Sequence, residues 1–137
     1  MAVFVDTSAL VKRYVAHPDR SLVIEAMAAD DVWVASAVAR TEVMLALHQL
    51  APGRHSQARL WHAFRDDWDA FAVVPVDDRC LARAVELGAR FSLHVVHAMH
   101  LAAADRLPRP LRYVTFDRRQ IPTAAALGFD VVSPVAA

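Results

Sequence analysis

The chain has 137 residues, of which 56% are hydrophobic and only three are glycine, so the composition argues against disorder and suits one ordinary domain, residues 1–137. Fifteen basic residues balance fifteen acidic ones, which argues against a strongly basic nucleic-acid coat but leaves room for a local basic patch. The single cysteine, Cys80, rules out an internal disulfide, and the sequence has neither a secretory signal pattern nor an apolar run of about 20 residues; we therefore expect a cytoplasmic protein with no membrane partner.

Short β-type runs alternate with longer helical patterns along the chain. The predicted elements, in chain order, are strand 3–5, helices 8–14 and 21–29, strand 32–35, helices 36–50 and 56–70, strand 72–76, helices 79–89 and 93–107, strand 111–115, helix 117–127 and strand 129–132. Alternation of this kind predicts an α/β fold with a five-stranded parallel sheet and helices on both faces.

The first predicted strand ends at an acidic residue, Asp6, followed by Thr7 and Ser8. In an open α/β sheet, ligands bind at the carboxyl ends of the strands, so a carboxylate at this place can hold a metal ion. A helix N-cap is the commoner use of such a residue, because the side chain accepts a backbone N–H bond there. The first segment alone leaves both interpretations open.

Two further acids belong to the same question. Asp117 follows the strand 111–115, and if that strand lies beside strand 3–5, Asp6 and Asp117 face one crevice. Glu42 lies in an otherwise apolar helix, so it is either at a solvent edge or turned into a polar pocket. Two carboxylates about 5 Å apart repel by roughly 3 kcal/mol at an effective dielectric constant near 20, and a bound Mg²⁺ or Mn²⁺ would reverse that repulsion.

These segments, taken in order, resemble a PIN domain, and more narrowly the VapC-type toxins of bacterial and archaeal toxin–antitoxin pairs. The resemblance rests on Asp6-Thr7-Ser8-Ala9-Leu10, Glu42, Ala98-Met99-His100-Leu101-Ala102 and Thr115-Phe116-Asp117, and it covers nearly the whole chain. It implies a three-layer α/β/α sandwich and a Mg²⁺- or Mn²⁺-dependent endoribonuclease, usually dimeric, whose cognate antitoxin covers the acidic pocket with its tail.

The resemblance also implies roles for particular residues. Asp6, Glu42 and Asp117 match three acids that hold the metal, and Thr115 matches a hydroxyl residue that supports the site. The remaining acid is a departure, because His97 stands where relatives commonly have aspartate, in the segment His97-Ala98-Met99-His100-Leu101.

His97 leaves three interpretations open. In the first, it is a ligand that alters the metal preference of the site. In the second, it is a general base or a phosphate contact. In the third, its presence means that the site is impaired in a domain that still binds partners. His94, His97 and His100 share roughly one helix face, but we expect His94 to be exposed and His100 to pack or hydrogen-bond without a ligand role.

The favoured function is therefore a VapC-type endoribonuclease that cuts structured RNA such as tRNA or rRNA and is neutralised by a VapB-like antitoxin. The alternative is a catalytically impaired PIN-like module that binds antitoxin or RNA without cleaving it. A receiver or a dehalogenase-like phosphatase is disfavoured, because Lys12 is the only lysine and Ser8 stands where the phosphatase needs a second acid.

The remaining charged residues carry weaker expectations. We expect a structural role for the other acids, including an exposed position for Asp66, Asp67 and Asp69 and a helix cap at Asp77 or Asp78. Four basic residues flank the proposed pocket and either contact RNA phosphates or are simply solvated: Lys12, Arg13, Arg118 and Arg119.

Overall fold

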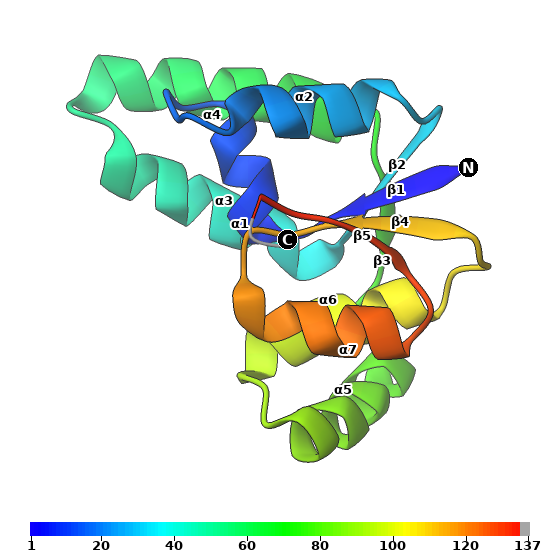
Figure 1. Ribbon diagram of the computed structural model, residues 1–137. Helices are drawn as coiled ribbons and strands as arrows, with labels where there is room; N and C mark the ends of the chain where they lie inside the picture. Colours follow the sequence, from blue (N-terminus) through cyan, green and yellow to red (C-terminus); the bar gives the residue numbers. More distant parts are fainter. Residues whose placement is uncertain (135–137) are drawn as a thin grey trace.

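The computed structural model describes residues 1–134, which form a five-stranded sheet with helices on both sides (Figure 1). The strands are β1 (Ala2–Val5), β2 (Val32–Ser36), β3 (Ala72–Val74), β4 (Leu111–Val114) and β5 (Asp130–Val132). All four pairings are parallel and the strand order is β3-β2-β1-β4-β5. The predicted α/β class and five-stranded parallel sheet are confirmed.

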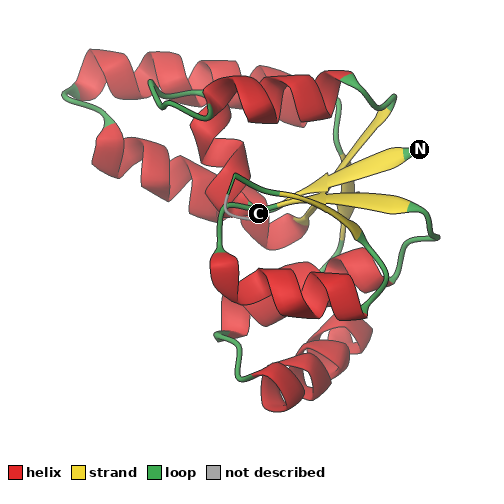
Figure 2. Ribbon diagram, viewed as in Figure 1, coloured by secondary structure: helices red, strands yellow, loops and turns green. Residues whose placement is uncertain are grey.

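The helices form the two outer layers (Figure 2). They are α1 (Thr7–Leu10), the 3₁₀ turn η1 (Val11–Arg13), α2 (Arg20–Ala28), α3 (Ala37–Leu50), α4 (Arg54–Trp68), α5 (Asp78–Phe91), α6 (Val95–Asp105), the 3₁₀ turn η2 (Arg118–Gln120) and α7 (Ile121–Ala126). One layer holds α1 to α4 and the other holds α5 to α7, as Figure 1 shows. Within residues 1–134, no helix has both the length and the apolar character that a membrane span requires.

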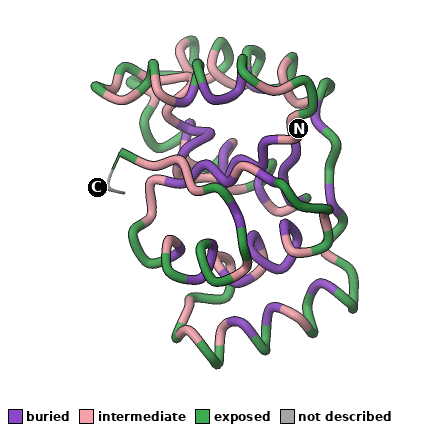
Figure 3. The backbone as a smooth tube through the Cα atoms, turned by 45° about the vertical axis from the view of Figure 1, so that its right-hand side comes forward, coloured by how far each residue is buried: buried purple, intermediate pink, exposed green. Residues whose placement is uncertain are grey.

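The alternation of side chains along β1 separates the two halves of the core. Val3 and Val5 pack in one apolar cluster with α1 to α4, whereas Phe4 packs in a second cluster with α5, α6 and α7. Successive residues of a strand point to opposite faces, so the central strand contributes to both layers. Figure 3 shows the result, with buried residues concentrated through the middle and most exposed residues on the outer helices and loops.

Several predicted boundaries were wrong. Strand 72–76 ends at Val74, and helix 79–89 instead runs from Asp78 through Gly88 to Phe91, with Gly88 lying against Ala98 of α6. The helix ends only at Ser92, which adopts a left-handed conformation with φ of 55°. The predicted helices 8–14 and 117–127 each divide into a 3₁₀ turn and a short α-helix.

The sheet order fixes where the functional residues lie. β1 is central, with β2 on one side and β4 on the other. The chain first builds one half of the sheet from β1 to β2 and β3, and then crosses back to build the other half from β4 and β5. The carboxyl ends of β1 and β4 are adjacent, and the Asp6 amide extends their pairing by donating to Val114 O at 3.2 Å. This is the edge at which an open α/β sheet binds ligands.

Candidate active site

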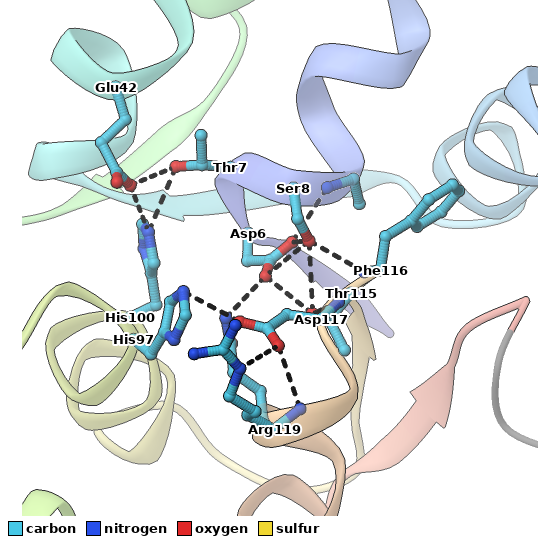
Figure 4. Close-up of polar contacts among 12 residues, drawn as sticks. Asp6, Thr7, Ser8, Glu42, His97, His100, Thr115, Phe116, Asp117 and Arg119 are labelled. Carbon is cyan, nitrogen blue, oxygen red and sulfur yellow. Dashed lines mark hydrogen bonds and ion pairs between the residues drawn. The ribbon is translucent and has the colours of Figure 1, made fainter. Parts of the chain in front are cut away.

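Three elements bring acidic side chains to this edge of the sheet. Asp6 follows β1, Asp117 follows β4, and Glu42 projects from α3, which crosses near α1 and α6. Figure 4 shows the three carboxylates around one region, with His97 and His100 entering it from α6. The neighbouring position of β4 and β1, on which the meeting of Asp6 and Asp117 depended, is confirmed.

Asp6 is the most deeply buried of the three acids, with 1% of its surface exposed. Its Oδ1 accepts from the Ala9 amide at 3.0 Å, so Asp6 is the N-cap of α1 as well as a member of the site. Burial raises the pKa of Asp6, while the charge of His100 and hydrogen bonds from Thr115, Ser8 and Ala9 act in the opposite direction. The cap and the site are therefore two uses of one carboxylate.

Hydroxyl and amide donors hold the Asp6 carboxylate in place. Thr115 Oγ1 donates to Oδ2 at 2.7 Å, Gln120 Nε2 donates to Oδ2 at 2.9 Å, and Ser8 Oγ donates to Oδ1 at 2.7 Å. Ser8 Oγ also accepts from the Phe116 amide at 2.8 Å, which joins α1 to the segment after β4. These bonds fix the direction of the carboxylate before any ligand arrives.

Glu42 is turned into the polar pocket rather than to the solvent edge. Its Oε1 accepts from Thr7 Oγ1 at 2.5 Å and from His100 Nε2 at 2.7 Å. His100 is buried and its Nδ1 bonds with Ser36 Oγ at 2.8 Å. Burial raises the pKa of Glu42, but the hydrogen bonds from His100 and Thr7 and the charges of His100 and His97 outweigh it, so the pKa is lowered.

Asp117 is held by groups from three directions. His97 Nε2 lies 2.8 Å from Asp117 Oδ2, and the Arg119 amide donates to Oδ1 at 3.0 Å. The Asp117 amide donates to Thr115 Oγ1 at 3.0 Å, so Thr115 connects Asp117 to Asp6. The Asp117 side chain is 15% exposed, against 26% for His97.

A cavity of about 180 Å³ opens among these residues. It is lined by Asp6, Thr7, Ser8, Glu42, His97, His100 and Gln120. Asp117 does not line the cavity, but it contacts His97, which does. Among residues 1–134, no three Asp, Glu, His or Cys side chains are grouped closely enough to hold a metal ion as they stand.

The donor chemistry nevertheless fits a divalent cation. Asp6, Glu42 and Asp117 supply carboxylate oxygens, which Mg²⁺ and Mn²⁺ prefer. His97 adds an imidazole whose Nδ1 is buried and has no hydrogen-bond partner within residues 1–134.

Other expectations met different outcomes. His94 is exposed and His100 is hydrogen-bonded, as predicted. Ser36 is the N-cap of α3 by position but makes no side-chain cap bond, because its hydroxyl bonds with His100 instead. Asp77 caps α5, also as predicted, and Cys80 is buried.

Two charged residues on the flank were misjudged. Arg13 Nε pairs with Asp67 Oδ2 at 3.0 Å and Tyr14 OH donates to the same oxygen at 2.8 Å. Asp67 is therefore half-buried rather than exposed with Asp66 and Asp69, and Arg13 lines a different cavity from the one that holds Asp6 and Glu42.

The sequence reasoning missed four residues of the site, Thr7, Ser8, Ser36 and Gln120. Gln120 is 1% exposed, and its Oε1 accepts from Tyr113 OH at 2.6 Å while its Nε2 donates to Asp6. A local signal for it exists in the Asp117 cap, because the bond from the Arg119 amide starts the turn η2 and carries Gln120 back toward β1.

Comparisons with known proteins agree with this architecture. A family model described as PIN domain matches residues 3–126. Ribonuclease VapC46 of Mycobacterium tuberculosis is 34% identical over 134 residues, which cover 97% of this chain and 98% of that protein.

Two solved structures share the fold at lower identity. A toxin–antitoxin complex from Klebsiella pneumoniae contains a chain with a TM-score of 0.72 and 21% identity, with 98% of both chains covered. The VapBC-5 toxin–antitoxin structure from Mycobacterium tuberculosis gives a TM-score of 0.65 and 18% identity, over 96% of this chain and 98% of that one. The family model and the 34% identical relative together decide the assignment: the chain belongs to the PIN-domain family and to its VapC-type branch.

Proposed function

We propose that this protein is a divalent-metal-dependent endoribonuclease of the VapC type that cuts structured RNA such as tRNA or rRNA. The observation that carries the proposal is the convergence of Asp6 and Glu42 on one cavity, with Asp117 attached to its wall through His97. The 34% identical relative named as a ribonuclease supports it over nearly the full length of the chain.

Asp6, Glu42 and Asp117 would hold Mg²⁺ or Mn²⁺, with His97 beside them. Such an ion supplies an activated water and neutralises charge that develops on a phosphodiester. The protein's own side chains hold the carboxylates in place: Thr115 and Ser8 hydrogen-bond to Asp6, and His100 hydrogen-bonds to Glu42. Ser8 Oγ is committed to Asp6 and to the Phe116 amide, so it serves as a support rather than as a nucleophile.

The RNA would approach over a locally basic rim, because the chain as a whole carries no net charge. Lys12 lies in η1, which follows α1 and so comes shortly after Asp6, and Arg118 and Arg119 lie in η2, which begins directly after Asp117. Arg13 does not belong to this rim, since its guanidinium is paired with Asp67. The Arg119 guanidinium lies 3.8 Å from Asp117 Oδ1, so Lys12 and Arg118 would be the main cations to offset the repulsion between the acidic pocket and RNA phosphates.

The proposed cellular setting follows from the VapC-type branch. The protein would act in the cytoplasm as a homodimer, residues 1–137 forming one domain, and a VapB-like antitoxin would cover the acidic pocket until it is removed. Structures that share this fold include toxin–antitoxin complexes, which supports a partner of that kind.

The experiment is an RNA cleavage assay with total tRNA and rRNA as substrates. Wild type is expected to cut in Mg²⁺ or Mn²⁺, to stop on chelation and to resume when metal is restored. Asp6→Asn is expected to lower the rate by about a hundredfold or more, because it removes a ligand. Asp66→Asn, on the exposed face of α4, is the matched control and should cut at the wild-type rate.

A second candidate is a PIN-like module that binds RNA or antitoxin without cleaving. The contact between His97 Nε2 and Asp117 Oδ2 favours it, because it engages a carboxylate that the metal needs. No cleavage with any metal, together with tight antitoxin binding and a gain of nuclease activity in His97→Asp, would establish this candidate. Metal-dependent cleavage by wild type would exclude it.

A further inference from the structure

His97 is the only nitrogen donor of the cavity that has a free valence among the described residues. His100, the other imidazole, already uses Nδ1 for Ser36 and Nε2 for Glu42. His97 uses Nε2 for Asp117, while its buried Nδ1 has no hydrogen-bond partner within residues 1–134. An unpaired buried donor or acceptor is unfavourable, so this ring gains from any partner that it can bind.

The position of His97 is fixed by its helix. Ala98 and Leu101, its neighbours on α6, are buried in the core, and α6 packs against α5 and β2. His97 and His100 are three residues apart and therefore project on the same side of the helix, toward the acids. His94 touches the His97 ring edge-on at a centroid distance of 5.7 Å, but it is exposed and lies outside the cavity lining.

Both oxygens of Asp117 are engaged by the protein. Oδ1 accepts from the Arg119 amide and Oδ2 contacts His97. A cation that uses Asp117 must therefore share Oδ2 with His97 or displace the ring. Mg²⁺ gains little from an imidazole ligand, so displacing the ring only costs it affinity, whereas Mn²⁺ accepts an imidazole nitrogen better than Mg²⁺ does and the later transition metals accept it better still.

We propose that His97 decides which cation this site binds, by acting as a nitrogen ligand that favours Mn²⁺ over Mg²⁺. The proposal rests on the metal site of the proposed function and adds its selectivity. Nε2 of this ring restrains Asp117 and Nδ1 is its unpaired nitrogen, so one substitution at this position removes both and changes the order of affinities.

The test measures metal binding without RNA. Mn²⁺ affinity is measured by electron paramagnetic resonance, and Mg²⁺ affinity by its competition with Mn²⁺, on full-length wild type, His97→Asn and His97→Asp. Wild type is expected to prefer Mn²⁺ by about tenfold or more, and the spin-echo signal of bound Mn²⁺ should show a coordinated nitrogen. His97→Asn supplies no imidazole, so the preference and the nitrogen signal should both decline.

The second variant and a matched control separate the possible outcomes. His97→Asp supplies oxygen in place of nitrogen and should raise Mg²⁺ affinity by about tenfold, while His94→Asn should leave both affinities unchanged. The proposal is overturned if His97→Asn retains the wild-type preference and nitrogen signal, or if wild type binds neither ion. Because the assay contains no RNA, nitrogen-bound Mn²⁺ without cleavage would refute the nuclease alone, and cleavage without that signal would refute the selectivity alone.

Discussion

Gln120 illustrates how one side chain ties the core to the site. It is buried between β4 and the end of β1, where it accepts from Tyr113 OH and donates to Asp6 Oδ2. Tyr113 is itself fully buried and stacks on Phe4 and Phe129. The direction of the Asp6 carboxylate is thus set in part by an aromatic stack on the opposite side of the sheet from α1.

Replacing Gln120 by leucine should destabilise the protein by about 1–3 kcal/mol, because the Tyr113 hydroxyl then has no acceptor in the core. The double variant Gln120→Leu, Tyr113→Phe should cost less than the sum of the two single changes, since it removes both partners. Urea denaturation of the four proteins measures this coupling. Strict additivity would show that the two side chains act independently.

Sequence reasoning reached the acids but not this glutamine, for a physical reason. Asp6 and Asp117 follow strand-like runs, and a strand end is visible in the local pattern. Gln120 follows two arginines and has the sequence character of an exposed residue. Its burial depends on Tyr113 and Asp6, partners that only the folded sheet supplies.

At the scale of elements, an ion pair attaches η1 to α4. Asp67 Oδ2 accepts from Arg13 Nε and Tyr14 OH, and burial together with the hydrogen bond and charge of Asp67 raises the pKa of Tyr14. The helical spacing of α4 did not reveal this role, because Asp66 and Asp67 differ only in which face of the helix they occupy.

Adjacent aspartates on α4 provide a matched test of that attachment. Asp67→Ala should destabilise the protein by about 1–3 kcal/mol, because it leaves the Arg13 charge and the Tyr14 hydroxyl without their acceptor. Asp66→Ala removes only an exposed contact with His62 and should change stability by less than about 0.5 kcal/mol. Equal denaturation midpoints for the two variants would contradict the structural role of Asp67.

A second attachment, between α6, α5 and the loop before β4, should depend on pH. Asp105 contacts Arg83 Nε at 2.8 Å and Arg109 Nη2 at 2.6 Å. Partial burial raises the pKa of Asp105, but the hydrogen bonds and charges of Arg109 and Arg83 outweigh it and lower the pKa below its ordinary value of 3.8. Because its pKa is lower in the folded state, the ionised Asp105 stabilises the folded protein fully at pH values above 3.8. This stability is lost as the pH falls through the folded-state pKa.

Asp105→Asn should therefore lower the free energy of unfolding at neutral pH by about 1–2 kcal/mol. The difference from wild type should shrink as the pH falls below about 4, where the wild-type carboxylate takes up its proton. Urea denaturation of both proteins across this range measures the effect. Two pH curves that stay parallel would show that Asp105 does not titrate against the arginines.

At the scale of the whole molecule, alternation of strands and helices was enough to predict the parallel sheet and its two helical layers. The order of the strands was predicted only conditionally, through the placement of β4 beside β1, because strand order depends on packing between distant segments. Some predicted helix ends were wrong because the local signal was not decisive. At α5, Gly88 was expected to stop the helix, but the helix passes through it and ends at Ser92. The site follows from the sheet order, since β1 and β4 carry Asp6 and Asp117 to the same edge.

The claim that one cation joins Asp6, Glu42 and Asp117 is tested most directly by titrating Mn²⁺ into wild type, Asp6→Asn, Glu42→Gln and Asp117→Asn in a calorimeter. The account predicts one ion per chain in wild type and a loss of affinity of about tenfold or more in each of the three variants, with Asp66→Asn unchanged. Wild-type affinity in any two of the three variants would contradict a shared site.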